Sequence, residues 1–157
     1  MKMLFKQKLF SWFDSYDIFD ENYEILYTVK GQFGWGHVLK IFDRNGNEVG
    51  MVKEKVFTWL PKFIIYKNDV EVGYIRKEFT FFKPKFTINY NSWQVEGDFL
   101  GWDYRIFSNE GNIAKVTKQL FKLTDTYLID VKDHNNALDA LMLVLAIDVE
   151  ECTRNRD

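Results

Sequence analysis

The feature that most constrains the fold is a segment of about eighteen residues that occurs four times. The copies span residues 2–19, 49–66, 72–89 and 113–130 and align without internal gaps. The second copy reads VGMVKEKVFTWLPKFIIY and the third reads VGYIRKEFTFFKPKFTIN. Repetition of this length indicates that one supersecondary unit is reused along the chain. We call this repeated segment the cassette.

Each cassette is predicted to form two strands. In its second half, apolar residues such as Phe86 and Ile88 alternate with polar ones, and a period of two is typical of a half-buried strand. In its first half, an apolar residue precedes three polar ones, as in Lys53-Glu54-Lys55. Alternation fails at this polar run, which predicts a bulge, a strand end or a strongly twisted stretch.

Two further strand pairs are predicted between cassettes, at 23–30 with 37–43 and at 92–96 with 103–107. Turns that carry Gly46 and Gly111 follow them, as expected for hairpins. The chain thus reads as two pseudo-symmetric six-stranded halves, and no linker separates them. We predict one mainly β domain over residues 1–151, a closed antiparallel barrel of about twelve strands, followed by a polar tail over 152–157. Closure would remove exposed sheet edges.

The last part of the chain is predicted to be a helix. Residues 133–136 supply Asp and Asn, which accept hydrogen bonds at helix starts. Residues 137–149 then carry large apolar side chains in nearly every direction, so this helix must be surrounded. A barrel of about twelve strands is too wide for its own side chains to fill. We therefore place the helix along the barrel axis, with the roles of Asp139 and Asp148 left open.

Composition limits the class of protein. The 157 residues have a formal net charge of −2, which argues against a nucleic-acid partner held by bulk charge. A single cysteine, Cys152, excludes an intrachain disulfide and favours a reducing compartment, the cytoplasm. Lysines interrupt the apolar N-terminus, unlike a signal peptide. The longest apolar segment, 137–149, is too short to be a transmembrane segment.

Several stretches together resemble the LURP-one-related family of the tubby-like group, whose bacterial members include YxjI-like proteins. They are the K-x-K-[LV]-F-[ST]-W stretches at 6–12 and 53–59, the PKF triplets at 61–63 and 84–86, and the apolar helix. The resemblance implies a twelve-stranded barrel around a C-terminal hydrophobic helix. Tubby proteins bind phosphoinositide headgroups, and the more distant phospholipid scramblases are linked to lipid movement. This chain lacks the Pro-rich extension, Cys cluster and membrane span of scramblases.

A basic stretch in the middle of the chain is the leading candidate for a binding site. Its aromatic residues are interleaved with basic ones, which suits an anionic lipid headgroup or another phosphate-bearing ligand. The alternative interpretation is that solvent-exposed strand faces carry lysine for solubility and edge protection. The candidate site residues are Lys53, Lys55, Arg76, Lys77, Lys83 and Lys85.

The leading prediction is therefore a non-enzymatic binding module. A second possibility is a protein-interaction or structural adaptor that uses exposed aromatics such as Trp35 and Trp102. A third, an enzyme, is disfavoured because the helix would fill the deepest concavity. The histidines, His37 and His134, lie far apart in the sequence without a Cys/His cluster, so no metal site or cofactor is predicted. The ligand and the oligomeric state are left open.

Overall fold

The computed structural model describes residues 1–6, 15–120 and 125–154. The connections inside the first and fourth cassettes, and most of the 6–12 stretch, lie outside these residues. The described part contains twelve strands, a 3-10 turn and one helix: β1 (Lys2–Lys6), β2 (Ser15–Phe19), β3 (Ile25–Gly34), β4 (Gly36–Asp43), β5 (Glu48–Lys55), β6 (Lys62–Lys67), β7 (Val70–Glu78), β8 (Lys85–Ile88), β9 (Gln94–Asp98), β10 (Asp103–Ser108), β11 (Gly111–Leu120), β12 (Asp125–Val131), η1 (His134–Asn136) and α1 (Ala137–Arg154).

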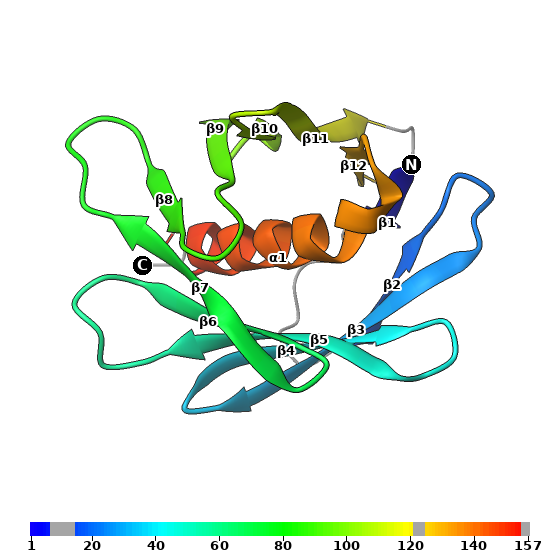
Figure 1. Cartoon of the computed structure of the whole chain (residues 1–157), viewed down its shortest axis with the longest axis horizontal. Helices are drawn as coiled ribbons and strands as arrows, with labels where there is room; N and C mark the ends of the chain where they lie inside the picture. The colour runs from blue at the N-terminus through cyan, green and yellow to red at the C-terminus, as the bar shows by residue number, and fades with distance from the viewer. Residues whose placement is uncertain (7–14, 121–124, 155–157) are drawn as a thin grey trace.

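The strands form one antiparallel sheet that curls into a nearly closed barrel (Figure 1). Its order is β8-β7-β6-β5-β4-β3-β2-β1-β12-β11-β10-β9, so the first strand pairs with the last. Between β8 and β9, the two outer strands of this order, the described residues form no ladder. The predicted twelve-stranded barrel, with β1–β6 and β7–β12 as its halves, is confirmed.

Each cassette is a strand pair, as predicted, and three of the four have a bulge at the same place. Register shifts leave Val49, Val72 and Ile113 as the extra residue in β5, β7 and β11. These are the first residues of the second, third and fourth cassettes. The polar run that begins at Lys53 is instead a strand end, because β5 finishes at Lys55.

The helix lies inside the barrel (Figure 1). The Asp133 carboxylate accepts a hydrogen bond from the Asn135 N–H at 2.9 Å, which caps the 3-10 turn before α1. Every residue from 140 to 151 is buried, as expected for a helix that is apolar nearly all round. The predicted central helix is thus confirmed. It continues to Arg154, three residues beyond the position predicted for the end of the domain.

The sheet approaches the helix closely at Gly50. A Cβ atom on this residue would lie 3.0 Å from Met142 Sδ and 3.3 Å from Leu138 Cδ1. A larger residue there would require the Met142 and Leu138 side chains to shift, since protein interiors have little free space. Glycine at this position of the second cassette therefore lets β5 pack closely against α1.

The barrel has two distinct ends. Because each strand is antiparallel to the next, connections after odd-numbered strands lie at one end and those after even-numbered strands at the other. The helix starts after β12 and therefore finishes at the odd-numbered end, which we call the cassette-loop end. Figure 1 shows the β5–β6 and β7–β8 connections on the left, towards which α1 runs, with the helix start on the right. We call the opposite end the helix-start end.

Candidate functional site

Five of the six predicted basic residues lie on the outside of β5–β8 or in the β7–β8 connection. The lysines are exposed and the Arg76 side chain is 37% exposed, whereas the alternate residues of the same strands point into the core. The strand period of two places them there. The five are Lys53, Lys55, Arg76, Lys83 and Lys85.

Cross-strand register brings three cations into one row. Lys55 of β5 faces Lys62 of β6, and Lys62 faces Arg76 of β7. Lys62 was not among the predicted site residues, although its place beside Pro61 in the cassette fixes this register. Like charges directly opposite each other destabilise a sheet, so a bound anion at this row would relieve repulsion. We call these three cations, together with Lys53 two residues before Lys55 on the same face of β5, the basic row.

An aromatic ring and one carboxylate complete this surface. Lys62 Nζ lies 4.1 Å from the centroid of the Tyr74 ring, and the Arg76 guanidinium carbon lies 5.6 Å from it. Arg76 Nη2 also lies 3.0 Å from Glu78 Oε1. A hydrogen bond with Thr87, followed by the pairing with Arg76, lowers the pKa of Glu78 from its ordinary value, so it stays ionised at neutral pH.

Lys77 is not part of this surface, and its prediction as a ligand-binding residue is wrong. Its side chain is 4% exposed and points into the barrel, because it follows the inward-facing Ile75 by two residues. Its Nζ lies 3.0 Å from Glu151 Oε1 and 3.4 Å from Glu150 Oε1 at the end of the helix. Lys77 therefore ties β7 to α1 and is not available to a surface ligand.

The two tryptophans proposed for a protein interface differ in position. Trp35, in the β3–β4 connection, is 80% exposed. Trp102 is only 8% exposed, and its ring centroid lies 4.0 Å from that of Tyr127 and 5.6 Å from that of Phe5. The β9–β10 connection folds Trp102 back onto the core, so its predicted place in an exposed patch is wrong.

The acidic residues of the helix lie inside the barrel. The carboxylate of Asp139 pairs with Lys67 Nζ at 3.1 Å at the helix-start end. Asp148 is buried towards the other end. Burial, and then the charges of Asp148 and Glu151, raise the pKa of the Tyr104 hydroxyl well above its ordinary value. Asp148 and Tyr104 are enclosed, so a surface ligand would not reach them.

Each histidine lies beside an acidic residue that accounts for its position in the fold. His37 Nδ1 hydrogen-bonds to Glu54 Oε2, which also accepts the backbone N–H of His37 at 3.1 Å. His134 is exposed beside the helix cap Asp133. Among the described residues, no group of three or more His, Cys, Asp or Glu side chains is arranged to hold a metal ion. Nor does any helix in this part of the chain have the length and apolarity to cross a membrane.

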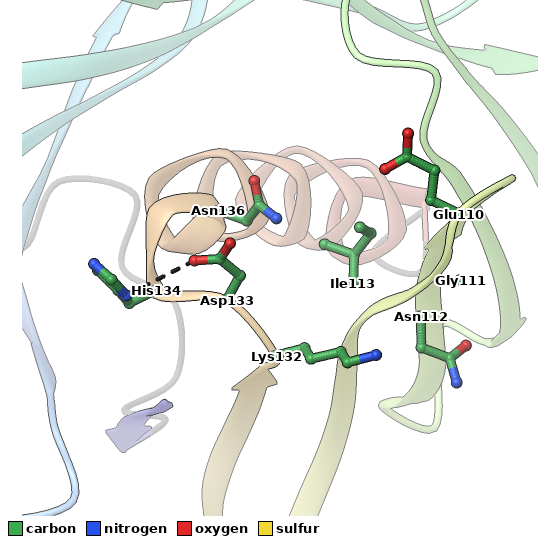
Figure 2. Close-up of a pocket in the computed structure, with 8 residues that line it drawn as sticks. All are labelled: Glu110, Gly111, Asn112, Ile113, Lys132, Asp133, His134 and Asn136. Carbon is green, nitrogen blue, oxygen red and sulfur yellow. Dashed lines mark ion pairs between the residues drawn. The ribbon is translucent and has the colours of Figure 1, made fainter.

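A pocket of about 450 Å³ opens at the helix-start end (Figure 2). Its polar side chains do not converge: in Figure 2, His134 and Glu110 point away from the centre. Asp133 holds the 3-10 turn, and Lys132 donates its backbone N–H to Ile113 O at 2.9 Å. Charges of both signs line the pocket, so it matches an anionic ligand less well than the basic row does.

A family model described as LURP-one-related matches residues 1–148. The chain belongs to the LURP-one-related family. The uncharacterized protein YxjI of Bacillus subtilis (strain 168) is a relative, 25% identical over 150 residues, which are 95% of this chain and 93% of YxjI. An X-ray structure of a protein from Arabidopsis thaliana has a similar fold, with a TM-score of 0.63 and 13% identity, over 94% of this chain and 90% of that one.

From the sequence, Trp59 and Phe82 were counted only among the aromatics interleaved with the basic residues, and Phe79 and Phe81 were not singled out. Phe79 and Phe81 lie in the β7–β8 connection and are 71% and 86% exposed. Phe82, next to them, is 97% exposed, as is Trp59 at the equivalent position of the second cassette. The sequence signal that could have identified these exposed aromatics was their position in the alignment of the four cassettes. Aromatic residues that fall between a polar strand end and a proline belong to the connection and not to the core.

Proposed function

We propose that this protein is a non-enzymatic binding module that holds a phosphate-bearing group at the basic row. The observation that carries the proposal is the register of Lys55, Lys62 and Arg76 on three neighbouring strands. Lys62 Nζ and the Arg76 guanidinium both lie over the Tyr74 ring, and Glu78 is an acidic neighbour paired with Arg76. A phosphate has several oxygens and can accept hydrogen bonds from several cations at once. Three adjacent cations can therefore hold it more firmly than two lysines on one strand face could.

Two features support binding over catalysis. The helix fills the interior of the barrel, where a ligand pocket would otherwise be expected. The basic row lies on a convex face of the sheet. A ligand bound there stays in contact with water, unlike a substrate enclosed in an active site. We infer a cytoplasmic location from the lone cysteine in the sequence, which suits a reducing compartment. Turnover in a broad screen of hydrolase and phosphatase substrates would contradict the proposal.

The test is a titration of the protein with inositol hexakisphosphate, a soluble polyanion. Isothermal titration calorimetry measures the binding. The variant Lys53→Glu/Lys55→Glu reverses two exposed charges of the basic row. Each basic residue near an anionic surface contributes about 1 kcal/mol, so the double reversal should weaken binding by about 2 kcal/mol or more. Binding to the wild type should also weaken as salt is raised, because exposed charges are screened.

A matched control changes the same total charge at the other end of the barrel. Lys2→Glu/Lys132→Glu alters two exposed lysines that lie away from the basic row. This variant should bind the polyanion like the wild type. Equal losses in both variants would mean that net charge alone attracts the ligand, and the basic row would not be a site.

The second candidate is a protein-interaction adaptor, which the 80% exposure of Trp35 favours. Its ring centroid lies 6.1 Å from that of Phe57, which is also exposed, so the two form an apolar surface. A purified partner that binds the wild type but not Trp35→Ala, with no polyanion binding by either, would establish this function in place of the first.

A further inference from the structure

A group of exposed aromatic side chains lies at the cassette-loop end. It belongs to three connections, β3–β4, β5–β6 and β7–β8, all of which follow odd-numbered strands. Its exposed fractions run from 71% to 97%. We call this group the aromatic rim: Trp35, Phe57, Trp59, Phe79, Phe81 and Phe82.

The size of the aromatic rim is unusual for a surface in contact only with water. An aromatic side chain has about 150–250 Å² of surface, so six of them at these exposures present roughly 600 Å² or more. Isolated exposed apolar residues are normal, but a group of this size marks a site of interaction with another molecule or with a membrane.

The connections hold these aromatics away from the core. Thr58 Oγ1 donates to Leu60 O at 2.7 Å, which closes the β5–β6 connection on itself. Thr80 Oγ1 donates to Lys83 O in the β7–β8 connection. The Lys77 N–H donates to Pro61 O at 2.9 Å and so joins the end of β7 to the β5–β6 connection. Phe57 has a φ of +60°, an uncommon conformation for an aromatic residue, which indicates that its outward position is maintained by the surrounding structure.

Neighbouring members of the rim lie side by side. The ring centroids of Trp35 and Phe57 are 6.1 Å apart, and those of Phe79 and Phe81 are 5.3 Å apart. A cavity of about 230 Å³ between the β5–β6 and β7–β8 connections is lined in part by Phe79 and Phe82. The aromatic rim is therefore one surface that spans adjacent connections.

Cations lie directly behind the aromatics. Lys55 and Lys62 form the last pair of β5 and β6 before their connection. Lys85 occupies the same position at the base of the β7–β8 connection, and Lys83 lies within it. Aromatic residues partition into the interface of a bilayer, and lysines pair with anionic headgroups at its surface. The order from the loop tips inward thus matches the order of layers in an anionic membrane.

The charges on the rest of the barrel fix the orientation. The β9–β10 side of the same end carries the exposed Asp98, and Asp103 there pairs with Lys115 Nζ at 2.7 Å, so this side would be attracted to an anionic surface less than the lysine-rich β5–β8 side. At the helix-start end, the exposed cations Lys2, Arg44 and Lys132 are outnumbered by carboxylates. These carboxylates are Glu21, Glu24, Asp69, Glu71, Glu110 and Asp133.

We propose that this protein docks on an anionic lipid bilayer by inserting the aromatic rim into the interface while the lysines behind it contact headgroup phosphates. The proposal extends the proposed function, because its charged half uses the basic row, and it assigns the phosphate to lipid. The barrel docks tilted, with the β5–β8 side of the cassette-loop end inward. A second copy of the chain suits this surface less well, since two sets of lysines would face each other.

The first test measures flotation with vesicles of phosphatidylcholine mixed with phosphatidylserine. The rim variant Phe57→Ser/Trp59→Ser/Phe82→Ser changes side chains that are at least 90% exposed, so it should fold normally, as circular dichroism can check. Loss of one inserted aromatic corresponds to about a tenfold loss of partitioning. The rim variant should therefore bind at least about tenfold more weakly than the wild type.

The matched control removes three exposed apolar residues from the opposite end, as Tyr23→Ser/Ile25→Ser/Val70→Ser. This variant should bind vesicles like the wild type. Vesicle binding by the rim variant at wild-type strength would overturn the inference. So would wild-type protein that stays unbound and instead forms a dimer that the rim variant loses in analytical ultracentrifugation, because the rim would then be a protein interface.

The second test reports insertion directly. Phosphatidylserine vesicles with brominated acyl chains should quench the tryptophan fluorescence of the wild type, and Trp59→Phe should bind equally but show less quenching. Binding without any quenching would place the aromatics outside the bilayer and overturn the insertion.

The two proposals fail in different ways. If the rim variant still binds inositol hexakisphosphate but not vesicles, both the basic row and the insertion are supported. If Lys53→Glu/Lys55→Glu binds vesicles at full strength and the rim variant does not, the rim inserts but the basic row is no phosphate site. If wild type binds the soluble polyanion and never binds vesicles, the basic row stands and the membrane inference fails.

Discussion

Replacing Lys77 by methionine should destabilise the fold far more than replacing any other lysine of the β5–β8 surface. The side chain is 4% exposed and lies between Glu150 and Glu151, whose side chains are 9% and 8% exposed. Methionine keeps the apolar length of lysine but removes the ammonium group. Two carboxylates then remain in the interior without this positive partner.

The magnitude follows from this burial. Removing one partner of a buried ion pair costs about 3–5 kcal/mol, because the remaining charge is left in a poorly solvated place. For a chain of this length, each kcal/mol lowers Tm by roughly 2–4 °C. Lys77→Met should therefore melt roughly 6–20 °C below the wild type.

Thermal unfolding followed by circular dichroism measures the effect, with Lys53→Met as the control. Lys53 is exposed, so that change should stay within about 0.5 kcal/mol of the wild type. A double-mutant cycle of Lys77→Met with Glu151→Gln isolates the pairwise energy. If Lys77→Met unfolds like Lys53→Met, the attachment of β7 to the helix through these charges is refuted.

Two further changes test the packing of the core and the loss of folding stability at acid pH. Trp102→Ala should cost about 3–5 kcal/mol in urea unfolding, since it removes a buried ring packed on Tyr127, while Trp35→Ala should be nearly neutral. Equal costs would contradict the assigned burial. The hydrogen bond with His37 holds the pKa of Glu54 below its ordinary 4.5, so its stabilisation is present above that pH and is lost as the pH falls through the lowered value. The stability difference between wild type and Glu54→Gln should shrink from about pH 6 to about pH 3, and a constant difference would exclude this linkage.

The parts of the fold that follow from periodicity were predictable. Two strands per cassette followed from alternation in residues 63–66 and 85–88, and the enclosed helix followed from apolar residues on all its faces. The position of Lys77 was also within reach. Ile75 faces the core, so a residue two positions later on the same strand faces it too.

The connections follow no such rule, and the error at Trp102 lies there. Trp35 and Trp102 both stand in glycine-rich connections, yet one is exposed and the other packs on the core. The gap between β8 and β9 was also beyond the sequence, because closure depends on the accumulated tilt of all the strands and not on any one of them.

The pairing of β1 with β12 has a consequence for biosynthesis. The N-terminal ammonium donates to Val131 O at 2.9 Å across 130 residues, and α1 follows only after that. While a nascent chain is still leaving the ribosome, it therefore lacks β12, which pairs with β1, and it lacks α1, around which the sheet curls. Contacts between distant parts of a chain slow folding and leave hydrophobic, aggregation-prone surface exposed while they form. Assembly of the barrel must wait until β12 and α1 have been synthesised, and a truncation that removes α1 would leave the sheet without the core against which it packs.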